Sequence, residues 1–194
     1  MTDPPEETRE QAAERTRLTP SLVLGLRDGD SQAGGLLDQL YRQPIQRFCY
    51  GYLRGEAEAE DAVQEIFYKV LRSELVPDDF RAWLYKIARN HCLNMIRDRG
   101  RRKDAHGLPD RSLAGAVSKG PLSRFAAAED LERLGAVLEK LPENYREVLR
   151  LRYAEDLSRR QVAEILDLPE SVVKSRLFEG MKMLRERVSV DERE

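Results

Sequence analysis

The chain has 194 residues, a formal net charge of −2, 35% charged and 41% hydrophobic residues, and only 12 glycines and 9 prolines. These values are typical of a soluble helical protein with one mid-sized domain or two small ones, and they exclude a fibrous or wholly disordered chain. No apolar run approaches the roughly 20 residues of a membrane span, and the N-terminus has no signal-peptide pattern. The two cysteines, Cys49 and Cys92, lie far apart. They exclude a disulfide framework and favour a reducing cytoplasm.

Charge is distributed unevenly along the chain. Residues 54–79 contain eight acids and three bases, whereas residues 86–103 contain seven bases and one acid. Adjacent segments of opposite sign favour two different partners. Two solvated faces of one domain are the alternative.

The N-terminal half has an almost continuous helical pattern. Residues 1–17 are polar, which predicts a disordered extension. Thr19 is then expected to N-cap a helix with Pro20 at its first position. The next amphipathic stripe is interrupted near Pro44. We expect residues 18–103 to form one small domain.

Two further helices of this domain carry the charged segments. In "EAEAEDAVQEIFYKVLRS" the apolar residues share one face, so the carboxylates lie on the other. In "FRAWLYKIARNHCLNMIRDRGRRK" an apolar stripe passes through Trp83 and Cys92, and the helix ends in bases. The stripe predicts that both of these side chains pack in the core.

The C-terminal half begins after a segment without periodicity. Residues 104–123 gather Gly, Pro and Ser, which predicts a flexible linker. Helical patterns return over residues 124–188 and leave a short tail, 189–194. The fold class is therefore all-α, with two small helical domains joined by a flexible linker.

The stretch "EILDLPESVVKSRL" predicts a helix-turn-helix in the C-terminal domain. Ser158 and Gln161 have the spacing of a capping box before the first helix, and Pro169 suits the start of the second. Lys174, Ser175 and Arg176 are expected to point outward, as direct contact with DNA bases and phosphates requires. A helical hairpin that only packs is the alternative.

Catalytic and metal-binding chemistry is not indicated. His91 and His106 are the only histidines, and His106 lies in the linker. The pair His91–Cys92 has no second ligand pair beside it, and adjacent helical residues diverge by about 100°. No Gly-rich phosphate loop is present. We therefore expect no catalytic residue, no metal and no cofactor.

Taken together, these segments resemble the extracytoplasmic-function group of bacterial RNA polymerase sigma factors. "AEDAVQEIFYKVL" is similar to the polymerase-binding helix of that family, and "FRAWLYKIARNHCLNMIRDRGRR" to its −10-reading helix. "LEKLPENYREVLRLRYAEDLSRRQVAEILDLPESVVKSRLFEGMKML" is similar to its −35 domain. The similarity extends from about Thr19 to Val188. It implies a non-catalytic subunit that binds the β′ and β subunits of core polymerase, recognises the promoter −10 and −35 elements and promotes strand opening.

The resemblance also implies functional residues for each of these contacts. Those for core polymerase are Asp61, Gln64 and Glu65. Those for the −10 element are Tyr85 and Asn90 at a pocket for a flipped base, and Lys86, Arg89, Arg97, Arg101 and Arg102 at phosphates. Those for the −35 element are Arg159, Lys174, Ser175, Arg176 and Phe178.

The chain departs from the family pattern in three places. The linker is mixed in sign, whereas many relatives carry an acidic linker into the RNA exit path. Residues 74–79 are short and acidic where relatives carry an aromatic-Arg-Gly stretch, and Asp78 and Asp79 stand where the displaced strand would pass. Glu179 and Gly180 follow Phe178, where the family often has a base. Glu179 either accepts a hydrogen bond from a cytosine amino group or repels phosphate.

The sequence leaves other questions open. The regulator implied by the family is an anti-sigma protein, with phosphorylation and control of expression as alternatives. The promoter consensus is not specified. A stand-alone helix-turn-helix regulator that acts without polymerase is the alternative function, but it gives the acidic and basic helices of the first domain no role.

Overall fold

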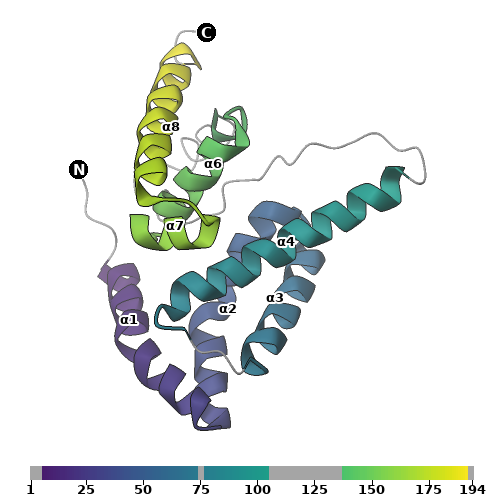
Figure 1. Ribbon diagram of the computed structural model, residues 1–194, viewed down its shortest axis with the longest axis vertical. Helices are drawn as coiled ribbons and strands as arrows, with labels where there is room; N and C mark the ends of the chain where they lie inside the picture. Colours follow the sequence, from purple (N-terminus) through teal and green to yellow (C-terminus); the bar gives the residue numbers. More distant parts are fainter. Residues whose placement is uncertain (1–5, 74–76, 105–136, 192–194) are drawn as a thin grey trace.

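The computed structural model describes residues 6–73, 77–104 and 137–191, and every regular element within these ranges is helical, as expected. Figure 1 shows α1, α2, α3 and α4 in one group and α6, α7 and α8 in a second group. No helix in these ranges has the length and apolarity needed to cross a bilayer.

The N-terminal domain is built around α2. It contains α1 (Glu6–Arg27), α2 (Ser31–Leu53), α3 (Glu56–Leu71) and α4 (Phe80–Asp104). Helix α2 packs against all three of the others, because its apolar stripe is long and its residues Leu37, Ile45 and Phe48 are fully buried. The Cys49 side chain on α2 and the Cys92 side chain on α4 are also buried, so the expected core position of Cys92 is confirmed.

Helix α1 corrects two expectations from the sequence. It begins at Glu6, so the disorder expected over residues 1–17 is wrong for residues 6–17; the first five residues lie outside the described ranges. Good helix formers such as Ala, Glu, Gln and Arg fill this stretch, which lacks only the apolar face that a periodicity argument needs. Thr19 is not an N-cap but lies inside the helix, where its hydroxyl is 2.8 Å from the Tyr41 hydroxyl.

Pro44 does not interrupt α2, contrary to expectation. The helix continues through it, and Pro44 itself is buried among the packed helices. Tertiary packing therefore offsets the hydrogen bond that a proline removes from a helix interior. The helix is capped at its start by the Asp30 side chain, which accepts a hydrogen bond from the Gln32 N–H.

The C-terminal domain combines two short helices with one long helix, and all of them contribute to a small core. Residues 137–139 are helical, and a turn at 140–141 leads to α6 (Glu143–Leu149), which continues as a π-helical turn, η2 (Arg150–Ala154). Helices α7 (Arg159–Leu166) and α8 (Glu170–Asp191) follow. Helix α8 packs against both α6 and α7, and its Val173 and Leu177 side chains are buried.

The expected capping box at the start of α7 is confirmed. The Ser158 hydroxyl accepts a hydrogen bond from the Gln161 N–H at 3.2 Å, and the Gln161 side-chain oxygen accepts one from the Ser158 N–H at 2.8 Å. Helix α7 ends at Leu166, and the left-handed backbone of its C-cap residue Asp167 (φ 53°) turns the chain toward α8. The two helices therefore have the bipartite arrangement predicted from the sequence.

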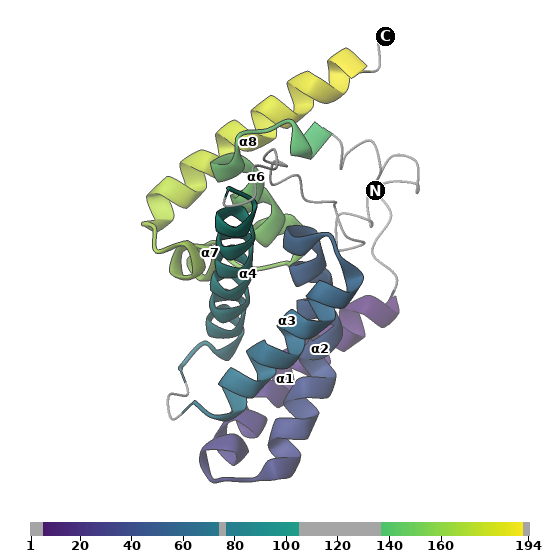
Figure 2. The ribbon, with the colours of Figure 1, turned by 90° about the vertical axis from the view of Figure 1, so that its right-hand side faces the viewer.

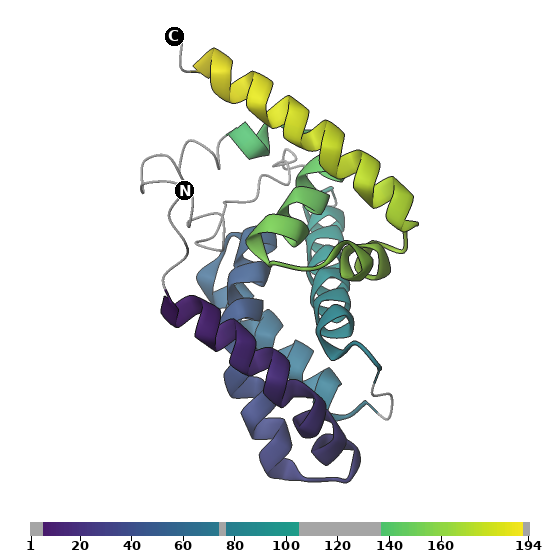
Figure 3. The same cartoon turned by 90° about the vertical axis from the view of Figure 1, so that its left-hand side faces the viewer.

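The two domains pack against each other. Helix α4 lies against α7, and Figures 2 and 3 both show α7 beside α4. The buried apolar residues of both domains belong to one cluster. The linker expected at residues 104–123 lies outside the described ranges, apart from Asp104 at the end of α4.

Substitution Ser158→Ala is expected to lower the free energy of unfolding by about 1 kcal/mol, because it removes the side-chain half of the capping box. Urea unfolding of the full chain measures this loss. Ser171→Ala, which removes an exposed hydroxyl in the first turn of α8, is the matched control and should change stability by much less. Equal effects of the two substitutions would contradict the importance of the capping box.

Candidate functional site

The outer face of α3 presents the residues expected to bind polymerase. Its Ala62, Val63, Ile66 and Phe67 side chains are buried against α2 and α4. The helical period therefore turns Asp61, Gln64 and Glu65 outward, where all three are exposed. None of the ion pairs found in the described residues uses Asp61 or Glu65.

Two apolar side chains continue this face and were missed in the sequence analysis. Tyr68 is 56% exposed and Leu71 is 46% exposed. They follow Gln64 at intervals of four and seven residues, so they share its side of the helix. The same spacing argument that placed the acids would have found them.

His91 lies beside this face, on α4. Its Nδ1 is 3.1 Å from the Nζ of Lys69 on α3. Burial, and then the positive charge of Lys69, lower the pKa of His91 below its ordinary value. The ring is therefore neutral near pH 7, and its Nδ1 accepts a hydrogen bond from the Lys69 ammonium.

The expected −10 residues on α4 fall into two groups. Tyr85, Lys86 and Arg89 lie against the C-terminal domain, as described below. Asn90, Arg97 and Arg101 are exposed, Arg97 bonds the Asn94 amide oxygen at 3.1 Å, and Arg101 pairs with Asp98 on its own helix. Arg102 lies on the same last stretch of α4. The structure thus places all these residues on one helix but leaves only some of them accessible.

The aromatic ring of Tyr85 is in the core rather than at the surface. It is 2% exposed and stands edge-on to Phe48, with the ring centroids 5.1 Å apart. Its hydroxyl donates a hydrogen bond to the Glu155 carboxylate at 2.9 Å. Burial raises the pKa of Glu155, and the nearby Arg150 charge opposes that shift. In this arrangement the Tyr85 ring cannot stack on a base.

Lys86 and Arg89 form ion pairs with carboxylates of the C-terminal domain. Lys86 Nζ is 2.5 Å from Asp167 Oδ1 in the turn between α7 and α8. Arg89 donates from Nε and Nη2 to the two Glu147 oxygens at 2.6 and 3.1 Å. The contact between Arg89 and Glu147 is a bidentate pair. A guanidinium binds a carboxylate more strongly in this geometry than through a single hydrogen bond.

Glu147 also accepts a hydrogen bond from Tyr52 on α2, at 2.9 Å. Burial, and then the Glu147 charge, raise the pKa of Tyr52 well above its ordinary value, so its hydroxyl stays protonated and donates. Burial alone would lower the pKa of Arg89, but the bond and charge of Glu147 raise it by more. The Glu147 carboxylate thus accepts hydrogen bonds from two helices of the N-terminal domain, α2 and α4, at once.

Arg150 extends from the C-terminal domain into a socket on α2. Its guanidinium carbon lies 4.3 Å from the centre of the Tyr52 ring and 5.1 Å from that of Phe48. Its Nη2 donates to the Phe48 carbonyl oxygen at 2.5 Å. Gly51 leaves room for this group, since a Cβ there would collide with it. The socket therefore fits a planar cation between aromatic rings and a carbonyl.

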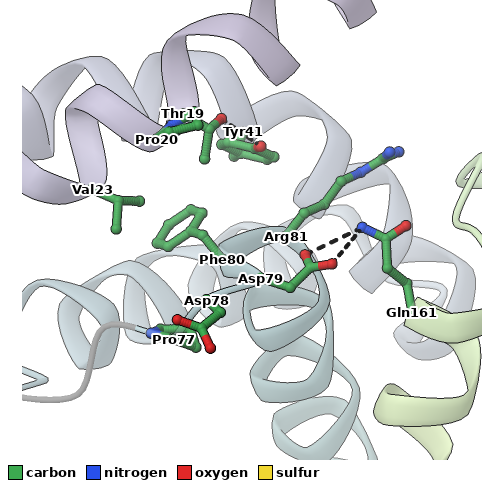
Figure 4. Close-up of a pocket in the computed structure, with 10 residues that line it drawn as sticks. All are labelled: Thr19, Pro20, Val23, Tyr41, Pro77, Asp78, Asp79, Phe80, Arg81 and Gln161. Atoms are coloured by element: carbon green, nitrogen blue, oxygen red, sulfur yellow. Dashed lines mark hydrogen bonds between the residues drawn. The ribbon is translucent and has the colours of Figure 1, made fainter.

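A cleft of about 380 Å³ lies beside the start of α4 (Figure 4). Its walls come from both domains: Thr19, Pro20, Val23, Tyr41, Pro77, Asp78, Asp79, Phe80, Arg81 and Gln161. Asp79 caps α4 by accepting from the Ala82 N–H at 2.9 Å, and both of its oxygens accept from the Gln161 amide nitrogen at 3.1 and 3.2 Å. Asp79 is therefore occupied by structural bonds, whereas Asp78 is exposed.

The expected −35 residues lie on the accessible side of the helix-turn-helix. Arg159, Lys174 and Ser175 are exposed, Arg176 is half-buried, and Phe178 is 70% exposed. Val173 and Leu177 are buried on the opposite side of α8 and fix its orientation. Four of the five expected residues are thus exposed, and only Arg176 is half-buried.

The segment after Phe178 has a packing explanation. Gly180 is buried where α8 passes over α6, and a Cβ there would stand 3.1 Å from Leu149 Cδ1 and 3.4 Å from Tyr145 Cβ. The neighbouring Glu179 is half-buried. The close approach of two helices accounts for the glycine, and the role of Glu179 stays open.

No cluster of three or more His, Cys, Asp or Glu side chains suited to a metal occurs among the residues that the structure describes. A hydrogen bond with Cys92, together with burial, raises the pKa of the Cys49 thiol. A protonated, buried thiol is a poor nucleophile and a poor ligand.

Comparisons with known proteins match both domains. The family model "Sigma-70 region 2" matches residues 37–102, and "Sigma-70, region 4" matches residues 131–184. The ECF RNA polymerase sigma factor SigW of Bacillus subtilis (strain 168) is 32% identical over 178 residues, 84% of this chain and 92% of SigW. The ECF RNA polymerase sigma-E factor of Escherichia coli (strain K12) is 30% identical over 177 residues, 86% and 92% of the respective chains.

Two solved structures are also similar. CnrH in complex with the cytosolic domain of CnrY has a TM-score of 0.63 at 23% identity, over 88% of this chain and 96% of that chain, and supports the fold alone. The sigma factor RpoE in complex with the anti-sigma factor NepR, from Bartonella quintana, has a TM-score of 0.61 at 26% identity, over 81% and 97%.

NMR titration of the full chain is expected to give His91 a pKa below 6.5. Substitution Lys69→Met should raise that pKa, because it removes the adjacent positive charge and leaves the burial unchanged. The spectrum of His91→Gln assigns the resonance, and Lys182→Met is the control for a distant charge. If Lys69→Met leaves the pKa of His91 unchanged, that result would contradict the contact between α3 and α4.

Proposed function

The chain belongs to the extracytoplasmic-function sigma factors of bacterial RNA polymerase, which direct transcription initiation, and from that premise we propose how its surfaces divide the task. Helix α3 binds core polymerase, α4 binds the −10 element, and the helix-turn-helix of α7 and α8 binds the −35 element. The observation that carries this proposal is that acidic and basic residues are segregated onto different helices of one fold.

The outer face of α3 suits a basic protein partner. Asp61, Gln64 and Glu65 offer two negative charges and an amide, and Tyr68 and Leu71 add apolar area that is exposed in the free chain. Complementary charge speeds encounter and fixes register, while apolar and aromatic side chains supply contact energy at the centre of an interface. We assign this face to the β′ subunit of core polymerase, with β as a further contact of the chain.

Helix α4 suits a strand of promoter DNA. Lys86, Arg89, Arg97, Arg101 and Arg102 supply cations for phosphates along its length. Phosphate contacts fix the register of a protein on nucleic acid, whereas base contacts supply the specificity. Tyr85 and Asn90 are the candidates for contact with an unstacked −10 base, which the Tyr85 ring can reach only after the domains separate.

Helix α8 suits the major groove of the −35 element. Lys174, Ser175 and Arg176 present short polar and cationic groups, and Phe178 offers an apolar surface suited to a thymine methyl group. Arg159 at the start of α7 is placed for a phosphate. This arrangement matches a recognition helix that is fixed by buried residues on its other side.

The proposed activity needs no catalytic residue and no cofactor of the chain's own, because polymerase performs the chemistry. Because polymerase and its DNA template are in the cytoplasm, we propose a cytoplasmic location for this chain. By analogy with RpoE, whose solved complex contains the anti-sigma factor NepR, we propose that an anti-sigma protein also binds this chain. A regulator acting without polymerase would leave the exposed face of α3 without a use.

The direct test is reconstitution. The purified chain is mixed with core polymerase, the complex is isolated, and run-off transcription is measured on genomic fragments. The proposal predicts a stable complex and initiation at a defined set of promoters. A chain that neither binds core polymerase nor starts any transcript would overturn it.

The double substitution Asp61→Lys and Glu65→Lys is expected to weaken core binding about tenfold or more, because it replaces complementary charges with repulsive ones. Fluorescence anisotropy of the labelled chain against core polymerase measures the change. The matched control is Glu164→Lys with Glu170→Lys, which alters net charge equally on the exposed C-terminal domain. Unchanged affinity in the α3 variant, with its helical circular dichroism intact, would remove α3 from the interface.

Substitution Lys174→Ala is expected to reduce use of promoters that depend on the −35 element and to lower the salt dependence of DNA binding by about one phosphate contact. Lys182→Ala, an exposed lysine two turns farther along α8, is the control. Run-off transcription and binding at several salt concentrations give the two readouts. Identical promoter use by the wild type and Lys174→Ala would argue against this contact.

A further inference from the structure

Helix α3 has one basic residue, Lys69, and it lies next to the face that we assign to polymerase. Lys69 follows Glu65 by four residues, and both side chains are exposed. An acid four residues before a basic side chain is the order and spacing that favours an ion pair on a helix. On α2 the pair of Asp38 and Arg42 has this spacing and forms, at 2.8 Å. Lys69 is therefore placed to neutralise Glu65.

The Lys69 ammonium is instead engaged by His91 on α4. Its Nζ lies 3.1 Å from His91 Nδ1. None of the ion pairs found in the described residues joins Glu65 to a basic side chain. Helices α3 and α4 pack against each other, and the next residue on α4, Cys92, is fully buried. The position of the imidazole beside Lys69 is therefore set by the packing of the two helices.

The contact defines the state of the His91 ring. An ammonium group has three donors and no acceptor, so the imidazole nitrogen that it meets must be the unprotonated one. Burial and the Lys69 charge, which lower the pKa of His91, agree with a neutral ring near pH 7. A neutral acceptor binds the ammonium without adding a second charge beside the α3 face. A carboxylate at this position would bind Lys69 as well, but it would add a negative charge.

Arg72, the C-cap residue of α3, is also engaged by an uncharged partner. Its Nη1 donates to the Tyr68 hydroxyl at 2.7 Å, and its guanidinium carbon lies 5.3 Å from the centre of that ring. The two basic side chains at the end of α3 are thus held by an imidazole and a phenol. Asp61 and Glu65 take part in none of the ion pairs of the described residues.

An unpaired carboxylate serves a basic partner better than one that is already neutralised. Complementary charge raises the rate of encounter and fixes register. An ion pair within α3 would cancel part of that charge, and polymerase would have to displace it. Exposed pairs at this spacing are strong enough to change an affinity about twofold, and salt screens them. Engagement of Lys69 by α4 therefore increases the effective charge of the α3 face.

We propose that His91 is a positioning residue for polymerase binding: it holds the Lys69 ammonium on α4 and so leaves Glu65 unpaired for a basic partner. This inference rests on the proposed function of α3. It gives a role to the one histidine among the residues that the structure describes, on a helix otherwise assigned to the −10 element. His91 acts through Lys69 and Glu65 rather than by a contact of its own.

The test measures the affinity of the full chain for core polymerase by anisotropy at low salt. His91→Leu should lower the affinity about two- to threefold, because the released Lys69 pairs with Glu65. His91→Asn should keep the wild-type affinity, because its amide oxygen replaces Nδ1 as the acceptor. Equal losses in the two variants would contradict the role of the acceptor.

Removal of Lys69 should abolish the effect of His91. Lys69→Met alone sets a new baseline, and His91→Leu added to it should cause no further loss, because no basic side chain is left on α3 to pair with Glu65. Damage to the fold at position 91 would persist in this background. A loss as large as that in the wild-type background would overturn the proposal.

Removal of the Glu65 charge gives the complementary result. In a Glu65→Gln background, His91→Leu should leave the affinity unchanged, because there is no carboxylate for Lys69 to neutralise. In the wild-type background the loss caused by His91→Leu should shrink at high salt. A loss that is the same with Glu65 and with Gln at this position would overturn the proposal.

The matched control is Asn94→Leu. It places the same side chain three residues farther along α4, where Asn94 is exposed and bonds only Arg97 of its own helix among the contacts described. Asn94→Leu should bind core polymerase like the wild type. If it weakens binding as much as His91→Leu does, the effect belongs to an added apolar side chain on α4, and the proposal fails.

Glu65→Gln alone separates these outcomes from failure of the proposed function. The proposed function predicts that this variant binds core polymerase more weakly than the wild type. If it binds equally well, Glu65 is not a polymerase contact, and the assignment and the inference both fail. If Glu65→Gln weakens binding and His91→Leu does not, the α3 face stays assigned to polymerase and only the role of His91 is overturned.

Discussion

Glu147 is the residue on which the arrangement of the two domains depends most directly. Its carboxylate accepts two bonds from Arg89 on α4 and one from Tyr52 on α2, while Arg150, one helical turn later, enters the socket beside Tyr52. A half-buried charge needs such partners, because removing it from water costs more than a single contact returns. The position of the C-terminal domain therefore depends on where Glu147 and Arg150 can find hydrogen-bonding and charged or aromatic partners on the N-terminal domain.

Helix α4 supplies cations to this interdomain contact. Two of the bases that we propose for the −10 element, Lys86 and Arg89, are paired with carboxylates of the C-terminal domain. The pair of Lys86 with the exposed Asp167 contributes only about 0–1 kcal/mol, as surface ion pairs do. The bidentate pair of Arg89 with Glu147 is the stronger of the two ion pairs.

Local signals made much of the fold predictable from the sequence. Helices α3 and α4 follow from apolar periodicity, and the capping box of Ser158 and Gln161 follows from a spacing of three residues. The acids of α3 and the bases of α4 followed from the same periodicity together with the resemblance. The start of α1 could not be predicted in this way, because residues 6–17 have helix-forming side chains but no apolar stripe.

The interdomain contacts could not be predicted from the sequence, for a different reason. Arg89 and Glu147 are 58 residues apart, and Lys86 and Asp167 are 81 apart, with no repeat or spacing that relates them. The segregation of charge suggested separate external partners, and nothing in one sequence showed that acids of the second domain would meet bases of the first. Gly51 and Gly180 gave no signal either, since only the packed structure shows what approaches them.

Helix α4 lies against the C-terminal domain in this structure, and we propose that it binds the −10 element in the promoter complex. The most direct measurement is the distance between spin labels at the exposed positions Asn90 on α4 and Glu164 on α7, in the free chain and in the complex with core polymerase. The account predicts a short distance in the free chain and one several tens of ångströms longer in the complex, roughly as 3.4 Å per base pair of promoter requires. The same short distance in both states would contradict it.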